Sequence, residues 1–445
     1  MLAVLFLCSI ALAQGAEPTV KTWGKPELVE TDNTGDALSP LIAFDSEGNA
    51  LSIWSQSSGG FLNLLANRYI EGKGWGKPEL LETSDFGNAF FPRLLADTKG
   101  NAFAIWQQGD DIPWQKRYTQ INIWTNHYVA GKGWGKAEYR EAEKIGLSRF
   151  PHIAFDKAGN AIATWERTDG TRFKIWASRY TPNGGWEKAQ LIEHNDIGHG
   201  DAYWPWVAFD PSGNAFVMWH QTDGKRFNVW AVHYTPSGGW EKPELMEHDD
   251  LGDALYPRMV FDSKGNGIAV WQQQGSTRVH IQAKRYDATK GWEKPEILEN
   301  ITQPTNGLQA QIAFDSQDNA IAVWEQSNGG KANVLANRYI AGKGWGKSER
   351  ISIDNGGSVI LPKIVIDSQG NAFSIWHQSD GNVFNIWAAR YTLGKGWNTP
   401  ELLEHDDSWH AANPEIAIDK NGNAIAVWQQ SDSKQRFSIW ANRFK

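Results

Sequence analysis

Tryptophan is the residue type in this chain that offers the most distinctive binding chemistry, because an exposed indole face stacks on flat or apolar ligand surfaces and attracts cations. The chain of 445 residues contains 25 tryptophans, and most recur at fixed places in an internal repeat. Four fall outside those places: Trp114, Trp204, Trp206 and Trp409. Departures from a repeat are common places for function to be added. We therefore predict that these four bind a ligand, the alternative being that they only cover the ends of their repeats.

Two arginines, Arg172 and Arg226, complete the predicted binding surface. A guanidinium presents several hydrogen-bond donors in a planar fork, which suits recognition of hydroxyl and carboxylate oxygens. Together with nearby aspartates, these arginines would fix the orientation of a ligand that stacks on tryptophan.

Acidic residues gather in the segments that connect one repeat to the next, as in "EHNDIGHGDA" (193–202) and "EHDDLGDA" (247–254). Clustered carboxylates suit Ca²⁺, a hard cation that takes several oxygen ligands. The candidate ligands are Asp196, Asp201, Asp249, Asp250 and Asp253. No segment has EF-hand spacing, and aspartate-rich connections also serve as plain turns. We therefore expect no required cofactor and keep Ca²⁺ as an open possibility.

Motifs for catalysis are missing from the sequence. We find no Gly-x-Ser-x-Gly elbow, no phosphate-binding loop and no His-Glu-x-x-His. Carboxylates are plentiful, so a glycosidase pair at a central channel stays as an alternative without a motif to support it. The enzyme question is left open, with binding favoured over catalysis.

The elements that position these residues follow from a phrase that occurs eight times, first as "IAFDSEGNALSIW" (42–54). It returns with a period of about 52 residues. One unit, 257–299, divides into four short apolar runs separated by turn residues, without helical periodicity. Four short strands at this period are typical of propeller blades. The aspartate of the phrase (Asp45 in the first copy) is expected to bind its own turn rather than a ligand.

Closure of the ring is also predicted from the sequence. The last unit ends at "IWANRFK" (439–445), and an orphan copy of the fourth strand, "WGKPELVE" (23–30), precedes the first unit. The N-terminal strand can therefore complete the final blade and remove an open sheet edge. We predict an all-β protein, an eight-bladed β-propeller of four-stranded antiparallel blades. Seven blades is the alternative, which would leave one copy unused.

The phrases "IAFD..GNA.AVW" and "NIWA.RY" resemble the tandem repeats of secreted bacterial β-propeller proteins. The resemblance covers nearly all of the chain after its first residues. It implies an exported propeller and brings no activity, cofactor or catalytic residue with it.

The first residues and the overall charge indicate where the protein works. An apolar run (2–13) followed by small residues predicts a signal peptide over 1–16, with one propeller domain over 17–445. The formal net charge of −8, without a basic stripe, argues against nucleic acid as a partner. No later apolar segment is long enough for membrane insertion. We expect a secreted or periplasmic protein.

Taken together, the sequence predicts a secreted, non-catalytic binding propeller. Its ligand would be a carbohydrate or a cell-surface ligand, recognised by Trp, Asp and Arg side chains in the loops of the crossover face. The first alternative is a protein–protein interaction scaffold that binds an envelope protein, and the second is a glycan-cleaving enzyme.

Overall fold

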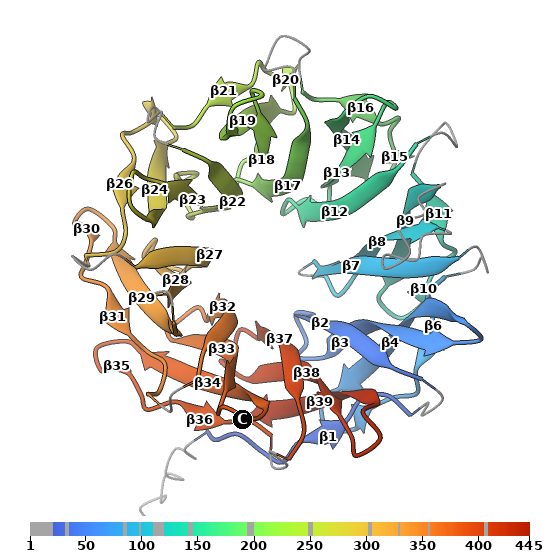
Figure 1. Cartoon of the computed structure of the whole chain (residues 1–445). Coiled ribbons are helices and arrows are strands. Elements are labelled where there is room, and N and C mark those ends of the chain that lie inside the picture. The colour runs from blue at the N-terminus through green and yellow to red at the C-terminus, as the bar shows by residue number, and fades with distance from the viewer. Residues whose placement is uncertain are drawn as a thin grey trace, which may run out of the picture.

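The chain winds into a ring of eight antiparallel sheets, which confirms the predicted eight-bladed β-propeller (Figure 1). The alternative of seven blades is therefore wrong. The computed structural model describes residues 21–31, 35–82, 87–97, 99–109, 120–140, 146–193, 200–247, 252–300, 305–327, 330–354, 357–404 and 408–445. Within these ranges every regular element is a strand. No helix that is long and apolar enough to cross a membrane occurs in them.

Within each blade the strands lie side by side, and their order along the chain leads from the ring axis outward. The innermost strands are β2 (Ala37–Phe44), β7 (Asn88–Ala96), β12 (Ser148–Phe155), β17 (Ala202–Phe209), β22 (Ala254–Phe261), β27 (Asn306–Phe314), β32 (Val359–Ile366) and β37 (Ala411–Ile418). The second strands are β3 (Ala50–Ser58), β8 (Ala102–Gly109), β13 (Ala161–Thr168), β18 (Ala215–Thr222), β23 (Gly267–Gln274), β28 (Ala320–Ser327), β33 (Ala372–Ser379) and β38 (Ala424–Ser431). The third strands are β4 (Phe61–Ile70), β9 (Ile121–Val129), β14 (Phe173–Thr181), β19 (Phe227–Thr235), β24 (Val279–Asp287), β29 (Ala332–Ile340), β34 (Phe384–Thr392) and β39 (Phe437–Phe444).

The outer strand of blades 1 to 7 consists of two short pieces that both pair with the third strand. The pieces are β5 (Gly74–Trp75) and β6 (Glu79–Leu80), β10 (Gly133–Trp134) and β11 (Glu138–Tyr139), β15 (Gly185–Trp186) and β16 (Gln190–Leu191), β20 (Gly239–Trp240) and β21 (Glu244–Leu245), β25 (Gly291–Trp292) and β26 (Glu296–Ile297), β30 (Gly344–Trp345) and β31 (Glu349–Arg350), and β35 (Gly396–Trp397) and β36 (Glu401–Leu402). In blade 5 the gap between the two pieces includes Pro295, which has no N–H to donate, and blades 2, 3 and 6 have the same gap without a proline.

The core lies between successive blades and is built on the repeated tryptophan. All eight tryptophans that close the second strand have 0% exposure. Trp324 of blade 6, for example, packs in one cluster with Val270 and Ile281 of blade 5. Its indole N–H donates to Gln326 at 2.7 Å, and six other blades repeat this bond. The buried rings therefore join neighbouring blades.

The aspartate of the repeated phrase is structural, as predicted. Asp45 Oδ1 accepts the backbone N–H groups of Glu47 and Asn49 at 2.9 Å each, and Asp45 Oδ2 accepts the Asn49 side-chain amide at 3.0 Å. The same set of bonds occurs at Asp419 in the last copy. The carboxylate fixes the turn between the first two strands of its blade.

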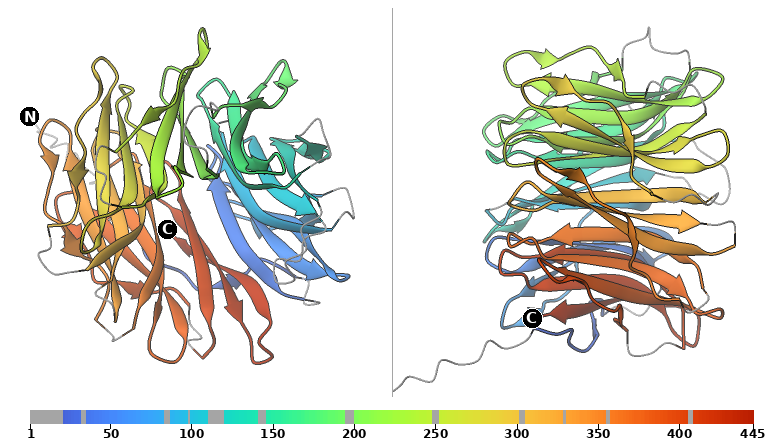
Figure 2. Two further views of the ribbon diagram at one scale, coloured as in Figure 1. Left: turned by 45° about the horizontal axis from the view of Figure 1, so that its top comes forward. Right: turned by 90° about the vertical axis from the view of Figure 1, so that its left-hand side faces the viewer.

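The two ends of the chain meet in blade 8. Strand β1 (Glu27–Leu28) pairs with β39, and Trp23 forms a further bridge with Phe444. The Asp36 carboxylate accepts the backbone N–H of Phe437 at 2.9 Å, which links blade 8 to blade 1. The predicted closure by the N-terminal strand is confirmed, and Figure 2 shows the closed ring from two further sides.

Candidate functional site

The innermost strands carry a tripeptide whose outer letters change from blade to blade. A proline stands at its centre in seven blades, and Ala310 takes its place in blade 6. The tripeptides are Ser39-Pro40-Leu41, Phe91-Pro92-Arg93, Phe150-Pro151-His152, Trp204-Pro205-Trp206, Tyr256-Pro257-Arg258, Gln309-Ala310-Gln311, Leu361-Pro362-Lys363 and Asn413-Pro414-Glu415. We call the first residue of each the rim position and the third the channel position.

Every rim position has left-handed backbone geometry. The eight residues have φ between 46° (Phe91) and 55° (Trp204 and Tyr256), although none is glycine. The register of the innermost strand shifts at this point in all eight blades, which marks a β-bulge. Such conformations are strained, persist where surrounding structure enforces them, and gather at functional sites.

The preceding blade holds most of these bulges by a side chain next to its buried tryptophan. Gln107 accepts the N–H of Phe150 at 3.0 Å, and His220 Nδ1 accepts that of Tyr256 at 3.4 Å. Glu325 and Gln429 hold the rim N–H groups of blades 7 and 1 in the same way. The rim backbone is therefore fixed from behind, and its side chain is left to vary.

Four consecutive rim positions carry aromatic rings that contact one another: Phe91, Phe150, Trp204 and Tyr256. We call them the aromatic arc. The ring centroids of Phe91 and Phe150 are 4.9 Å apart, Phe150 stacks on Trp204 at 4.3 Å, and Trp204 meets Tyr256 edge-on at 5.7 Å. The arc spans blades 2 to 5, whose innermost strands are β7, β12, β17 and β22 (Figure 1).

The arc is an exposed aromatic surface rather than a buried core. Phe91 is 44% exposed, and Trp204 and Tyr256 are 37% exposed, whereas the eight structural tryptophans are fully covered. Large aromatic rings held in the open by strained backbone are unusual in a folded protein. This surface is therefore the clearest candidate for ligand contact in the described part of the chain.

Below the arc, the channel positions line a central cavity of about 700 Å³. Leu41, Arg93, His152, Trp206, Arg258, Gln311, Lys363 and Glu415 face it, one from each blade. The rest of the lining comes mostly from apolar residues of the same strands, such as Ile153, Val207 and Phe261. Among the lining residues that the structure describes, the polar side chains thus lie at one level, next to the mouth.

A stack of three side chains forms the wall beneath the arc. The Trp206 ring lies 3.9 Å from the His152 ring centroid, and the Arg258 guanidinium lies 4.4 Å from the centroid of Trp206 on cation–π terms. The indole N–H of Trp206 donates to the Met259 carbonyl at 3.0 Å, which fixes the ring. A smaller hollow, lined by His152, Trp204 and Arg258 among others, connects arc and wall.

His152 is neutral in this setting. Burial lowers the pKa of its imidazole well below the usual value, and the charges of Arg93 and Arg258 lower it further. Its Nδ1 accepts the backbone N–H of Val207 at 3.3 Å. The neutral ring therefore carries its proton on Nε2, where it serves as a hydrogen-bond donor.

Of the four predicted tryptophans, the structure brings two together. Trp204 lies in the arc, and Trp206 lies in the channel wall directly below it. Trp409 lines a different hollow in blade 8, across the ring from blade 4 (Figure 1). Trp114 falls outside the described residues.

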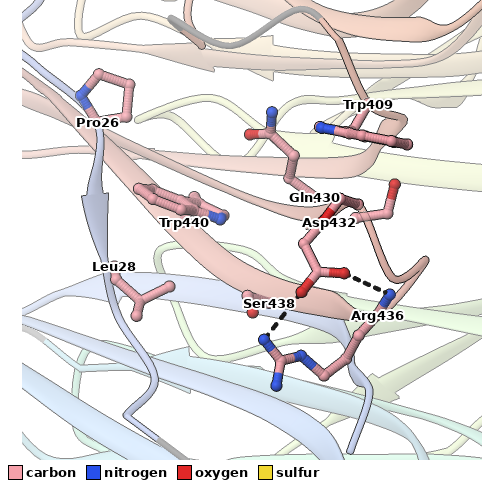
Figure 3. Close-up of a pocket in the computed structure, with 10 residues that line it drawn as sticks. Pro26, Leu28, Trp409, Gln430, Asp432, Arg436, Ser438 and Trp440 are labelled. Carbon is pink, nitrogen blue, oxygen red and sulfur yellow. Dashed lines mark hydrogen bonds and ion pairs between the residues drawn. The ribbon is translucent and has the colours of Figure 1, made fainter. Parts of the chain in front are cut away.

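The hollow around Trp409 is a crevice of about 560 Å³ at the outer part of blade 8. Its walls include Trp409, Trp440 and Leu28, with the two tryptophans on either side of Gln430 (Figure 3). Gln430 accepts the N–H of the buried Trp428 at 3.0 Å, and Asp432 pairs with Arg436 at 2.9 Å. We call this hollow the blade-8 crevice.

The predicted arginines serve the scaffold. Arg172 pairs with Glu193 at 3.2 Å, and the Glu193 side chain is fully buried. The backbone N–H of Arg226 donates to Asp223 at 3.0 Å in the loop before β19. Neither residue lines the channel or the arc.

The predicted metal ligands that the structure describes also have scaffold partners. Asp201 accepts the N–H of Phe173 at 2.6 Å, and Asp253 accepts that of Phe227 at 2.8 Å, so each links two blades. Across the described residues, no group of three or more His, Cys, Asp or Glu side chains is arranged to hold a metal ion. Asp196, Asp249 and Asp250 lie outside the described residues.

Sequence reasoning missed most of the site, namely Phe91, Phe150, Tyr256, Arg93, His152 and Arg258. Each looks ordinary alone, because single aromatic and charged residues are common in strands. The signal was available in the repeat: no two copies share the same pair of residues around the central position, while the flanking apolar residues stay similar.

Comparisons with known proteins show the fold alone. The structure is similar to an ulvan lyase of polysaccharide lyase family PL25, with a TM-score of 0.54 and 10% identity over 93% of this chain and 94% of that one. It is also similar to the polysaccharide lyase Uly1, with a TM-score of 0.52 and 11% identity over 85% of this chain and 93% of that one. No family model matches the sequence, and no curated protein matches it.

Proposed function

We propose that this protein is a non-catalytic propeller that binds a glycan at the mouth of its central channel. The observation that carries the proposal is the aromatic arc, four touching rings held in the open by strained backbone. Aromatic faces pack well against the apolar faces of sugar rings and keep little conformational freedom to lose on binding. The polysaccharide lyases of similar fold act on glycans, which agrees with this ligand class.

Two features favour binding over cleavage. Among the channel-lining residues that the structure describes, one has a carboxylate side chain. This residue is Glu415, and it pairs with Lys363. Hydrolysis by a pair of carboxylates therefore lacks its second group there. In addition, Nδ1 of His152 is engaged with Val207 and Nε2 carries the proton, so the ring is placed to donate rather than to abstract a proton.

The proposal includes export from the cytoplasm and independence of metal. The apolar run of residues 2–13 supports export. The backbone amides bound by Asp201 and Asp253 support the absence of a calcium requirement. A scaffold role stays the alternative, and it would use a broader surface than this curved arc.

The test is a glycan array probed with the full chain and with two matched variants, Trp204→Ala in the arc and Trp409→Ala in the blade-8 crevice. We expect saturable binding that weakens at least tenfold in Trp204→Ala, as for a central aromatic contact, and less than twofold in Trp409→Ala. Bound glycans should keep their chain length, and a chelator should not change binding.

Other outcomes decide between the alternatives. Equal loss in both variants would contradict the assignment to the mouth. Shortened glycans would contradict the non-catalytic reading. Loss of binding on chelation would restore the calcium hypothesis. An array without any bound glycan would contradict the proposal as a whole and favour a protein partner.

A further inference from the structure

The channel wall carries positive charge in a protein whose formal net charge is −8. Among the eight channel positions, Arg93, Arg258 and Lys363 are cations and Glu415 is an anion. Lys363 and Glu415 form an ion pair with each other. The remaining positive charge belongs to Arg93 and Arg258. They are the channel positions of blades 2 and 5, the two blades whose rim residues form the ends of the aromatic arc.

Arg93 and Arg258 are held without a carboxylate partner among the residues that the structure describes. The Arg258 guanidinium lies on the Trp206 ring, and its Nη2 and Nε donate at 3.1 Å to the Gln311 amide oxygen in the orientation that satisfies both groups. Arg93 Nη1 donates to the carbonyl of Pro92 at 3.2 Å. Neutral acceptors orient the two guanidinium groups and leave their charge in place.

The charge of Arg93 acts on Arg258, and Glu415 attracts both arginines. Burial in the channel wall and, second to it, the charge of Arg93 lower the pKa of Arg258 to about 10, against the attraction of Glu415. Both groups stay protonated at neutral pH. Two partly buried like charges at one level of a channel are unfavourable, and a bound anion would reduce that cost.

His152 adds a donor at the same level of the channel. Its channel position lies between those of Arg93 and Arg258 in blade order, and its neutral ring presents Nε2–H. A neutral donor beside two cations matches an oxyanion better than a cation or an uncharged sugar. Beyond this level, the side chains that the structure describes along the channel wall are mostly apolar.

We infer that Arg93, Arg258 and His152 bind the acid group of an anionic sugar, a carboxylate or a sulfate ester, while the sugar rings lie on the aromatic arc. The sugar part of this inference rests on the proposed function, and the anion part rests on the channel alone. Each guanidinium would donate charge-assisted hydrogen bonds to the acid oxygens. The ligand class is therefore an acidic glycan rather than a neutral one.

The experiment is a calorimetric titration of the full chain with sodium glucuronate, glucose 6-sulfate and glucose, and with the acidic glycans that bind on the array. The variants are Arg258→Gln and Arg93→Gln, with Arg436→Gln from the blade-8 crevice as the matched control. Arg258→Lys keeps the charge without the planar group. Thermal unfolding checks that each variant is folded.

We expect at least one acid sugar to bind at least tenfold more tightly than glucose. Arg258→Gln and Arg93→Gln should remove at least tenfold of that affinity, Arg258→Lys should lose less, and Arg436→Gln should lose none. Preference for the sulfate or the carboxylate identifies which acid group the site takes. Equal affinity for acid and neutral sugars, or no effect of either glutamine substitution in a folded variant, would overturn the inference.

The two proposals fail differently. If acid sugars bind through the arginines while Trp204→Ala has no effect and no glycan binds on the array, the anion site stands and the glycan-binding function falls. If neutral glycans bind through Trp204 and the arginine variants bind them equally well, the function stands and the anion site falls.

Discussion

The channel mouth and the blade-8 crevice are both hollows lined by tryptophan, yet their construction differs. The crevice has a counterpart in blade 5, where Gln273, Gln282, Pro295 and Ile297 occupy corresponding places in a hollow of about 520 Å³. The mouth has no counterpart, because it combines one rim and one channel residue from every blade and no two blades carry the same pair. A hollow that recurs is a product of blade architecture, whereas a hollow built from the varying letters of the repeat is specific to this protein.

The polar groups of the two hollows differ in the same sense. In the crevice, Asp432 and Arg436 satisfy each other, and Gln430 is committed to the indole below it. At the mouth, two arginines keep their charge unpaired by carboxylate among the described residues. Ligand recognition needs polar groups that can still bind a charged partner, and the two arginines at the mouth are such groups.

The largest expected effect concerns the closure of the blade that carries the crevice. Deleting residues 1–30 removes β1, its pairing with β39 and the fully buried Val29. We expect a loss of about 4 kcal/mol in the free energy of unfolding and a decrease of about 4 °C in Tm. Thermal unfolding and light scattering measure both the loss and any association through the open edge. A chain that starts at Lys21 is the control, and equal Tm values for the two chains would contradict closure by β1.

A smaller effect concerns two buried histidines that hold rim positions from the preceding blade. Burial lowers the pKa of His220 to about 3, below its unfolded value near 6.5. Unfolded chains therefore take up a proton that the folded protein refuses, and stability falls as the pH decreases from 6.5 toward 3. His220→Gln removes this loss and keeps an acceptor for the N–H of Tyr256, since Gln107 already plays that role in blade 2.

We expect His220→Gln to gain about 1–2 kcal/mol over the wild type at pH 5 relative to pH 7.5, measured by urea unfolding at both pH values. His377 is the matched position in blade 7: burial lowers its pKa to about 4, and it accepts the N–H of Asn413 in blade 8 at 3.2 Å. His377→Gln should show the same gain, with ligand affinity unchanged in both variants. A variant that stays as acid-sensitive as the wild type would show that its histidine does not titrate as described.

The smallest effect belongs to the ion pair of the crevice. Arg436 and Asp432 are 30% and 36% exposed, so solvent screens their attraction. Arg436→Gln should change the free energy of unfolding by less than about 0.5 kcal/mol and leave ligand binding intact. A larger change by urea unfolding would mean that the crevice is more than a by-product of blade geometry.

The sequence predicts the ring much better than the site, for a physical reason. Trp54 and Asp45 recur because each blade needs the same ring between sheets and the same turn, so repetition reveals them directly. The site residues are those that the scaffold does not specify. Trp204 was found because tryptophan is conspicuous, whereas Phe150 and Arg258 were missed because single aromatic and charged residues are common in strands and only a comparison of the eight tripeptides sets them apart.

The rim bulge gives the ring eight equivalent positions at which the side chain can vary. Main-chain geometry, and in most blades a side chain from the preceding blade, hold the rim backbone, so one rim residue can change without altering the others. Four rim positions carry no aromatic ring: Ser39, Gln309, Leu361 and Asn413. Aromatic substitutions at these positions would move the arc around the ring axis or extend it toward a complete ring of aromatic side chains. One scaffold could then present many different binding surfaces at the channel mouth.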